Sequence, residues 1–195
     1  HPTWKMGKKI SVDSSTLINK VYELIEAKKI FNLSYEKFEI IIQPTSYIHA
    51  IVEFKSGIYK ILSHPTSMRI PIYNSLLFID KISDIYESFD IKKMNNLNFQ
   101  KIDKLKFPVF KLLNRLNNLD SLYETILVSA NDALVDLFLK KKIKFYDIYK
   151  ILDKVLRFNE YKKFKFLKPQ NLDQIIKLSE NVRLKTISLS VQSKV

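Results

Sequence analysis

Helical periodicity first appears between residues 14 and 30. Apolar residues recur there at helical spacing and cover roughly two thirds of the surface of the predicted helix. The remaining surface is a polar stripe that consists of Thr16, Asn19, Lys20, Glu23 and Glu26. Ser14 or Ser15 stands where a helix N-cap is favoured, so we expect the helix to begin at this point.

Short segments rich in β-branched residues follow this helix. They occupy residues 37–43, 47–54 and 58–62, and Lys55-Ser56-Gly57 supplies a turn before the last of them. Alternation within 47–54 gives one wholly apolar face and one mixed face, and the mixed face carries Tyr47, His49, Ile51 and Glu53. We therefore expect at least three sheet strands, covered by helices on one side and facing a partner or a substrate cavity on the other.

The second half of the chain is mostly helical in pattern. Residues 72–79 predict a short helix, whereas residues 80–106 are polar and aperiodic, which is typical of a linker. Pro108 stands where a first-turn proline is favoured, and helical periodicity follows it. The later helices are predicted at 121–142, 145–158 and 171–187. Amphipathic helices joined by short loops predict a small bundle.

This order of elements predicts an α+β fold with a mixed sheet, flanking helices and a small C-terminal helical bundle. We expect residues 1–79 to be the remainder of a central catalytic and dimerisation domain. Residues 80–106 are then a linker, and residues 107–195 a C-terminal α-helical domain.

The composition is that of a globular protein. Of the 195 residues, 46% are hydrophobic and 27% charged. No apolar run approaches the roughly 20 residues that a membrane helix needs, and the N-terminus has no signal-peptide pattern. The absence of cysteine excludes disulfides, thiolate metal sites and a cysteine nucleophile from this chain. We expect no membrane association, and a location in a bacterial cytoplasm or in the stroma of a plastid-type organelle.

The net charge of +13 suggests a nucleic-acid partner at first sight. However, only four of the 33 basic residues are arginine, the side chain that base readers favour. The lysines are also scattered over the whole chain, which is typical of a solvated surface. We therefore expect no nucleic-acid partner, and we keep a basic non-catalytic binding module or scaffold as the alternative to an enzyme.

The polar stripe of the first helix could bind a phosphate and a metal. A helix N-terminus attracts anions, and Ser14, Asn19 and Lys20 could all reach one phosphate there. Glu23 follows Asn19 by one helical turn and could present a hard oxygen ligand to Mg²⁺ or Mn²⁺. The same spacing also fits a solvated helix face with a surface pair between Lys20 and Glu23.

The segment before this helix is predicted to be a loop. Pro2 and Gly7 bound it, and it exposes Trp4 and Met6. These side chains fit either a lid that closes over a bound substrate or an anchor that holds the loop on the core. A single histidine on a strand, such as His49, is more often a structural hydrogen-bonding group than a catalytic one.

The segments HPTWKMGKKISVDSSTLINK (1–20) and ELIEA (23–27) resemble the central segment of the 1-deoxy-D-xylulose 5-phosphate reductoisomerases. The resemblance continues in QPTSYIHAIVEF (43–54) and MRIPI (68–72). It is weaker in SANDALVDLFL and IKFYDI. This family converts its ketose phosphate to 2-C-methyl-D-erythritol 4-phosphate in isoprenoid biosynthesis, with NADPH and with Mg²⁺ or Mn²⁺.

The resemblance implies roles for the residues of the N-terminal loop. His1 and Trp4 are expected to contact the sugar phosphate substrate and to belong to the catalytic site. Met6 and Gly7 are expected to lie near the nicotinamide of NADPH.

The resemblance also assigns the polar stripe. Ser14, Asn19 and Lys20 correspond to substrate-binding residues, and Glu23 to one of three acidic metal ligands that also meets the substrate. His49 corresponds to a histidine near the active site.

Some positions depart from the family pattern. Val21-Tyr22 stands where Gly-Leu is usual, Gln43 where His is common, and Asp132 where the family has Glu. Leu77-Phe78-Ile79 replaces a usual Trp-Pro pair.

The resemblance places an NADPH-binding domain and the other acidic metal ligands upstream of His1. We therefore expect the chain to be a piece of a homodimeric enzyme and to have no turnover alone. The mixed strand face around Tyr47 and Glu53 is the expected dimer side.

Overall fold

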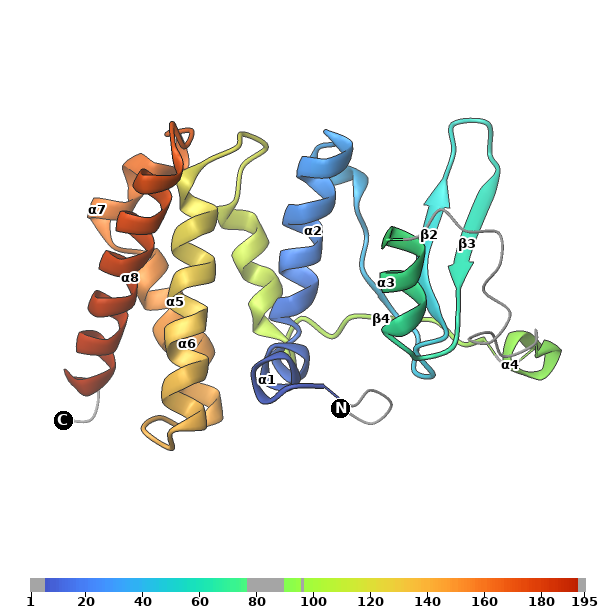
Figure 1. Cartoon of the computed structure of the whole chain (residues 1–195), viewed down its shortest axis with the longest axis horizontal. Coiled ribbons are helices and arrows are strands. Elements are labelled where there is room, and N and C mark those ends of the chain that lie inside the picture. Colours follow the sequence, from blue (N-terminus) through green and yellow to red (C-terminus); the bar gives the residue numbers. More distant parts are fainter. Residues whose placement is uncertain (1–5, 77–89, 96, 193–195) are drawn as a thin grey trace. The chain divides into compact units, whose positions relative to one another are not determined.

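The computed structural model describes residues 6–76, 90–95 and 97–192 (Figure 1). The described residues of Ile40–Ile102 form one compact unit, and those of Met6–Glu39 together with the chain from Asp103 onward form another. The first helices of the chain thus belong with the C-terminal helices. The sequence-based domains 1–79, 80–106 and 107–195 follow a different division and stay a prediction.

The first unit contains short strands and helices. Its elements are β1 (Ile41–Ile42), β2 (Ile48–Glu53), β3 (Tyr59–Ser63), α3 (Arg69–Leu76), α4 (Ile91–Asn95) and β4 (Gln100–Lys101). The strands form two antiparallel pairs, β1 with β4 and β2 with β3. Each of the three predicted segments contains a strand, so the expectation of at least three strands is confirmed. Within the described residues, however, the strands form two small sheets instead of one, and β1, the short strand of the first segment, pairs with β4 in the predicted linker.

The β2–β3 hairpin agrees with the predicted turn. The N–H of Phe54 donates to the carbonyl of Ile58 (2.9 Å), and Gly57 has a φ of 83°, a conformation that glycine adopts without strain. A register shift between Ile48 and Ala50 interrupts the ladder near its open end. Alternation of the two faces along β2 is therefore regular only from Ala50 onward.

The second unit is entirely helical in its described part. Its elements are α1 (Lys8–Thr16), α2 (Ile18–Phe31), η1 (Tyr35–Lys37), η2 (Pro108–Arg115), α5 (Leu122–Leu139), α6 (Phe145–Leu156), α7 (Asn159–Lys162), η3 (Lys163–Lys165) and α8 (Leu172–Gln192). The predicted helices at 121–142, 145–158 and 171–187 are confirmed as α5, α6 and α8. The segment after Pro108 is a 3₁₀ helix, and α7 was missed.

Helix α5 forms the centre of this unit, with α6 and α8 packed on it (Figure 1). Its side chains at Leu122, Ile126, Leu127 and Leu134 are fully buried. Burial of these apolar side chains is the main favourable term in holding the helices together. The helix-dominated structure with small sheets confirms the α+β class. No helix in the described ranges is long and apolar enough to cross a lipid bilayer.

The predicted single helix at 14–30 is two helices with a kink at Leu17. Leu17 has left-handed backbone angles (φ 60°, ψ 15°), and its N–H donates to the carbonyl of Ser14 (3.1 Å). Helix α1 begins earlier than expected, at Lys8, with Gly7 at its N-cap. The prediction that Ser14 or Ser15 caps the helix was therefore wrong, because both lie inside α1.

Candidate functional site

The first turns of α2 carry the polar stripe. Lys20 Nζ donates to Glu23 Oε2 at 2.7 Å, and Asn19 Nδ2 donates to Glu23 Oε1 at 2.9 Å. Both carboxylate oxygens of Glu23 thus accept hydrogen bonds from residues one turn earlier on the same helix. The side chains of Lys20 and Glu23 are each 46% exposed, so a ligand can reach this group of atoms from solvent.

The opposite face of α2 explains this exposure. Ile18, Val21, Leu24 and Ile25 are buried on that face. Because residues three or four positions apart share one side of a helix, their burial turns Asn19, Lys20 and Glu23 outward. The amphipathic pattern thus orients the stripe, as the sequence predicted.

The kink provides the helix N-terminus. Helix α2 starts at Ile18, so Asn19 and Lys20 lie in its first turn, where backbone N–H groups and the helix dipole favour an anion. Ser14 lies in the last turns of α1, and its carbonyl holds the N–H of Leu17. The kink therefore brings the backbone at Ser14 next to the start of α2. The anion site stays a prediction, and the helix N-terminus that it needs is that of α2 and not of a helix that begins at Ser14.

Only part of the predicted loop is described. His1 and Trp4 lie outside the described residues. Met6 is half-buried, and Gly7 caps α1 through the hydrogen bond from the N–H of Ser11 to its carbonyl (3.0 Å). A Cβ added to Gly7 would meet no atom within 4 Å, so packing does not require glycine there.

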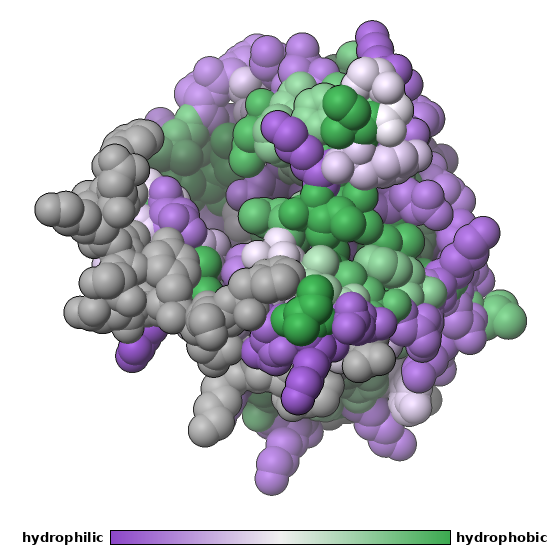
Figure 2. Space-filling view, turned by 90° about the vertical axis from the view of Figure 1, so that its right-hand side faces the viewer, coloured by the Kyte–Doolittle hydropathy of each residue, from purple (hydrophilic) through white to green (hydrophobic). Residues whose placement is uncertain are grey.

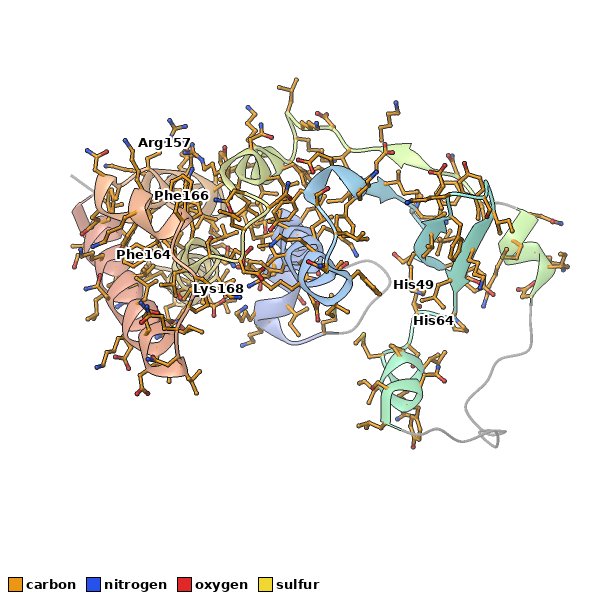
Figure 3. All side chains as sticks on the ribbon, turned by 90° about the horizontal axis from the view of Figure 1, so that it is seen from above. His49, His64, Arg157, Phe164, Phe166 and Lys168 are labelled. Atoms are coloured by element: carbon orange, nitrogen blue, oxygen red, sulfur yellow. The ribbon has the colours of Figure 1, made fainter. Side chains whose placement is uncertain are left out.

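His49 lies in the other unit, on β2, and stacks on His64. The two ring centroids are 3.7 Å apart and the ring planes are inclined by 19° (Figure 3). His49 Nε2 donates to the carbonyl of His64 (3.0 Å), and His64 Nδ1 donates to the carbonyl of Pro65 (2.7 Å). These bonds fix one nitrogen of each ring as a donor. The predicted structural role of His49 and its implied place near an active site are compatible with this geometry.

Sequence reasoning did not single out His64. The signal was nevertheless present, since a hairpin with strands at 47–54 and 58–62 brings residue 64 opposite the start of the first strand. The structure confirms this placement, because the N–H of His64 donates to the carbonyl of Tyr47 at 3.2 Å.

Glu23 is the candidate metal ligand in this chain. Among the described residues, no three His, Asp or Glu side chains lie close enough together to hold a metal ion. An exposed carboxylate on a rigid helix fits one ligand of an octahedral Mg²⁺ or Mn²⁺ site, but one carboxylate does not complete such a site. The described residues therefore offer part of a metal site.

Comparison with known proteins places this chain in a class of enzymes. The family model "DXP reductoisomerase C-terminal domain" matches residues 62–185. A second model, "1-deoxy-D-xylulose 5-phosphate reductoisomerase C-terminal domain", matches residues 1–31, which include α1 and α2. The class is thus the NADPH-dependent reductoisomerases. The chain belongs to the 1-deoxy-D-xylulose 5-phosphate reductoisomerase family.

Individual relatives agree with the family models. The reductoisomerase of Pelagibacter ubique (strain HTCC1062) is 56% identical over 191 residues, which are 98% of this chain and 49% of that protein. The reductoisomerase of Sulfurihydrogenibium sp. (strain YO3AOP1) is 40% identical over 195 residues, with 98% and 49% covered. The chain therefore spans about half the length of the curated relatives it matches.

Solved structures show the same fold. A crystal structure of DOX-P reductoisomerase in complex with NADPH, fosmidomycin and magnesium has a TM-score of 0.90 and 29% identity, covering 100% of this chain and 48% of that one. The reductoisomerase from Zymomonas mobilis in complex with NADPH has a TM-score of 0.79 and 32% identity, covering 93% and 47%.

Proposed function

We propose that this chain supplies the phosphate-binding helix and one metal ligand of a 1-deoxy-D-xylulose 5-phosphate reductoisomerase. The whole enzyme would convert 1-deoxy-D-xylulose 5-phosphate to 2-C-methyl-D-erythritol 4-phosphate, with NADPH and with Mg²⁺ or Mn²⁺. The observation that carries this proposal is the exposed group of Asn19, Lys20 and Glu23 in the first turns of α2. Membership of the family supports it.

The phosphate of the substrate binds at the start of α2. The Lys20 ammonium group, the Asn19 amide and the first-turn N–H groups favour a doubly charged anion there, and Ser14 adds a hydroxyl. In the described structure Lys20 and Asn19 both donate to Glu23. Substrate binding would turn these donors toward the phosphate and hydroxyl oxygens, which leaves the Glu23 carboxylate available.

Glu23 holds the divalent cation, together with acidic ligands from the part of the enzyme that precedes His1. When bound, the cation supplies Lewis-acid polarisation of the substrate carbonyl. Three solved structures of relatives are described as complexes with magnesium, which supports a metal in the whole enzyme.

The N-terminal loop covers the substrate. His1 and Trp4 contact it, and Met6 and Gly7 lie near the nicotinamide, as the resemblance implies. Closure of such a loop excludes water during hydride transfer. The half-buried Met6 just before α1 supports this role, because it ties the loop to the helix that leads into the phosphate site. The resemblance also assigns His49 to the active site of the whole enzyme, and the stacked ring of His64 supports the orientation of its imidazole.

A homodimer forms through the β2–β3 hairpin. The hairpin exposes apolar side chains on both faces, among them Ile51, Val52, Ile61 and Leu62. Figure 2 faces this side of the chain and shows apolar side chains gathered on it. A two-stranded hairpin is marginal alone, so these faces need covering by the rest of the enzyme or by a second copy. Tyr47 is only 9% exposed, so the free part of the mixed face is at Ile51 and Glu53.

The matched relatives are bacterial enzymes, and a bacterial cytoplasm is therefore the proposed location. Within the described residues no observation favours the alternative of a basic non-catalytic module. Lysines at the α2 site and at its two ends are already paired with carboxylates.

The proposed function is tested by comparing the full-length protein with the 195-residue chain in an NADPH oxidation assay with 1-deoxy-D-xylulose 5-phosphate and Mg²⁺. Turnover by the full-length protein and none by the chain alone is the expected result. No turnover by the full-length protein with either Mg²⁺ or Mn²⁺ would contradict the proposed function, and clear turnover by the chain alone would contradict the shared site.

A further inference from the structure

A buried polar group lies beneath the α1–α2 kink. We call it the Asp13 cluster, and it consists of Lys9, Asp13, Tyr22, Asn131 and Asp132. Asp13 on α1 is 2% exposed and Asn131 on α5 is 1% exposed. Asn131 Nδ2 donates to Asp13 Oδ1 at 2.8 Å, which joins residues 118 positions apart in the sequence. The cluster thus fixes α1 directly on the central helix.

Lysine 9 bridges the two carboxylates of the cluster. Its Nζ lies 2.8 Å from Asp13 Oδ2 and 2.9 Å from Asp132 Oδ1. Burial alone would lower the pKa of Lys9, but the hydrogen bonds to Asp13 and Asp132 outweigh it and raise the pKa above its ordinary value. Lys9 is therefore a cation between two acceptors. The guanidinium group of Arg183 on α8 lies 3.9 Å from Asp132.

Tyr22 closes the cluster from α2. Its hydroxyl and the Oδ1 atom of Asn131 are buried and have no hydrogen-bond partner among the described residues. Burial first, and then the charges of Asp13 and Asp132, raise the pKa of Tyr22 well above its ordinary value, so the hydroxyl stays neutral. Tyr22 and Asp132 are two of the positions that depart from the family pattern, and here they share one cluster.

The cluster adjoins the residues that shape the phosphate site. Asp13 directly precedes Ser14, whose carbonyl holds Leu17 at the kink. The carbonyl of Asp13 itself accepts from Thr16 Oγ1 at 3.1 Å, and the same hydroxyl group faces the N–H of Ile18 at 3.4 Å. A change in the position of Asp13 would therefore be transmitted to the first residue of α2.

Stability alone does not account for such a cluster. Apolar residues of similar volume usually hold two helices together as well as a buried ion pair does. Directional hydrogen bonds instead fix the register of one helix on another. The bonds of Asp13 to Asn131 and Lys9 fix the register of α1 on α5, one turn before the kink at Leu17.

We propose that Asp13, Asn131 and Lys9 are positioning residues that hold the α1–α2 kink in the orientation in which Ser14, Asn19 and Lys20 meet the substrate phosphate. This inference rests on the proposed function and deepens it. None of the three needs to touch the substrate, since they act through the backbone of the kink.

The other end of α2 offers a matched control. There Lys28, which is buried, pairs with Asp120 just before α5 at 2.9 Å. This contact also ties α2 to the central helix through an aspartate, but it lies more than two helical turns from Asn19 and Lys20. Its loss should weaken the packing of α2 without moving the kink.

The experiment compares Asp13→Asn, Lys9→Met and Asp120→Asn in the full-length enzyme. In Asp13→Asn an amide N–H₂ group must face either Lys9 or Asn131, both of which are donors. Lys9→Met removes the bridge from a half-exposed side chain and leaves Asn131 as the donor to the Asp13 carboxylate, and its thermal midpoint is measured beside the kinetics. We expect the KM for 1-deoxy-D-xylulose 5-phosphate to rise about tenfold or more in both, with the KM for NADPH within about twofold of wild type.

Asp120→Asn is expected to lower the thermal midpoint, as Asp13→Asn does, while both KM values stay at wild type. If the substrate KM rises as much in Asp120→Asn as in Asp13→Asn, the Asp13 cluster has only a structural role and the proposal is overturned. An unchanged substrate KM in Lys9→Met, measured beside an active wild-type enzyme, would also overturn the proposal. Absence of turnover in the wild-type enzyme would instead overturn the proposed function, and with it the positioning role.

Discussion

Replacement of Lys20 by methionine separates the proposed phosphate-binding role of α2 from its role in folding. The Lys20 side chain is 46% exposed, and its ion pair with Glu23 is a surface pair one turn apart on the same helix. Such a pair contributes only about 0.2–1 kcal/mol, so Lys20→Met should leave the thermal midpoint nearly unchanged. A change in kinetics can then be attributed to binding.

The expected loss follows from one charge-assisted hydrogen bond to the phosphate. Such bonds contribute about 1.5–3 kcal/mol, which corresponds to roughly one to two powers of ten in affinity. In a steady-state NADPH oxidation assay on the full-length enzyme, the KM for 1-deoxy-D-xylulose 5-phosphate should rise by that factor in Lys20→Met.

A matched variant controls for the lost charge. Lys177 is an exposed lysine on α8, and Lys177→Met changes the net charge by the same amount away from the α2 site. This variant should keep the wild-type KM. The reasoning would be refuted by a KM in Lys20→Met that equals the wild-type value, or by an equal rise in Lys177→Met.

Three further outcomes are expected of the full-length protein. The hydrogen bond from Lys28 lowers the pKa of the Asp120 carboxyl in the folded protein. The ionised carboxylate therefore stabilises the fold at pH values above its unfolded-state pKa of about 3.9. This stabilisation is lost as the pH falls through the lower pKa of the folded state. In thermal unfolding, wild type should therefore exceed Asp120→Asn at pH 7, and the difference should shrink below pH 4; a constant difference would contradict the pairing. Tyr123→Phe removes the hydrogen bond that the buried Tyr123 hydroxyl donates to the carbonyl of Leu156 at the end of α6 (2.7 Å). The free energy of unfolding should fall by about 1–3 kcal/mol, while the KM values stay unchanged. An unaltered denaturant midpoint would argue against this hydrogen bond. His64→Ala should lower kcat by up to about tenfold, because the ring that stacks on His49 is lost. His64→Phe keeps an aromatic ring at this position and should retain most of the wild-type kcat. Equal losses of kcat in the two variants would exclude stacking as the cause.

The sequence predicted the regular parts of the fold well. The apolar positions of α5, α6 and α8 recur at helical spacing, and the structure buries them. The turn at Gly57 followed from the residue type that its positive φ requires. In each of these cases the local pattern and the tertiary packing favour the same conformation.

The kink at Leu17 could not be predicted from local pattern. Leucine rarely adopts left-handed backbone angles, and the apolar periodicity continues across the break. The kink also adjoins the tertiary hydrogen bond between Asp13 and Asn131, whose partners are 118 positions apart and which no local pattern reveals. The pairing of β1 with β4 is likewise long-range, because its second strand lies in a segment without strand periodicity.

The candidate site was predicted in part for the same reason. Spacing along one helix placed Asn19, Lys20 and Glu23 together, and the structure confirms that they are hydrogen-bonded. The contribution of His64 depends on how two strands pair, and the Asp13 cluster depends on how three helices pack. Neither relation is visible in a short stretch of sequence.

The most direct test of the shared site is a metal titration of the full-length enzyme that carries Glu23→Gln. Glutamine keeps the size of the side chain and its place on α2 but removes the charge that a hard cation prefers. The rate of NADPH oxidation is measured as a function of the Mg²⁺ concentration and of the Mn²⁺ concentration. The same titrations are made with the wild-type enzyme and with Glu26→Gln, a control that alters an exposed carboxylate on the same helix. We expect Glu23→Gln to need at least about tenfold more metal or to lose turnover, and Glu26→Gln to match wild type. A wild-type metal dependence and kcat in Glu23→Gln would contradict the assignment of α2 to the metal and phosphate site.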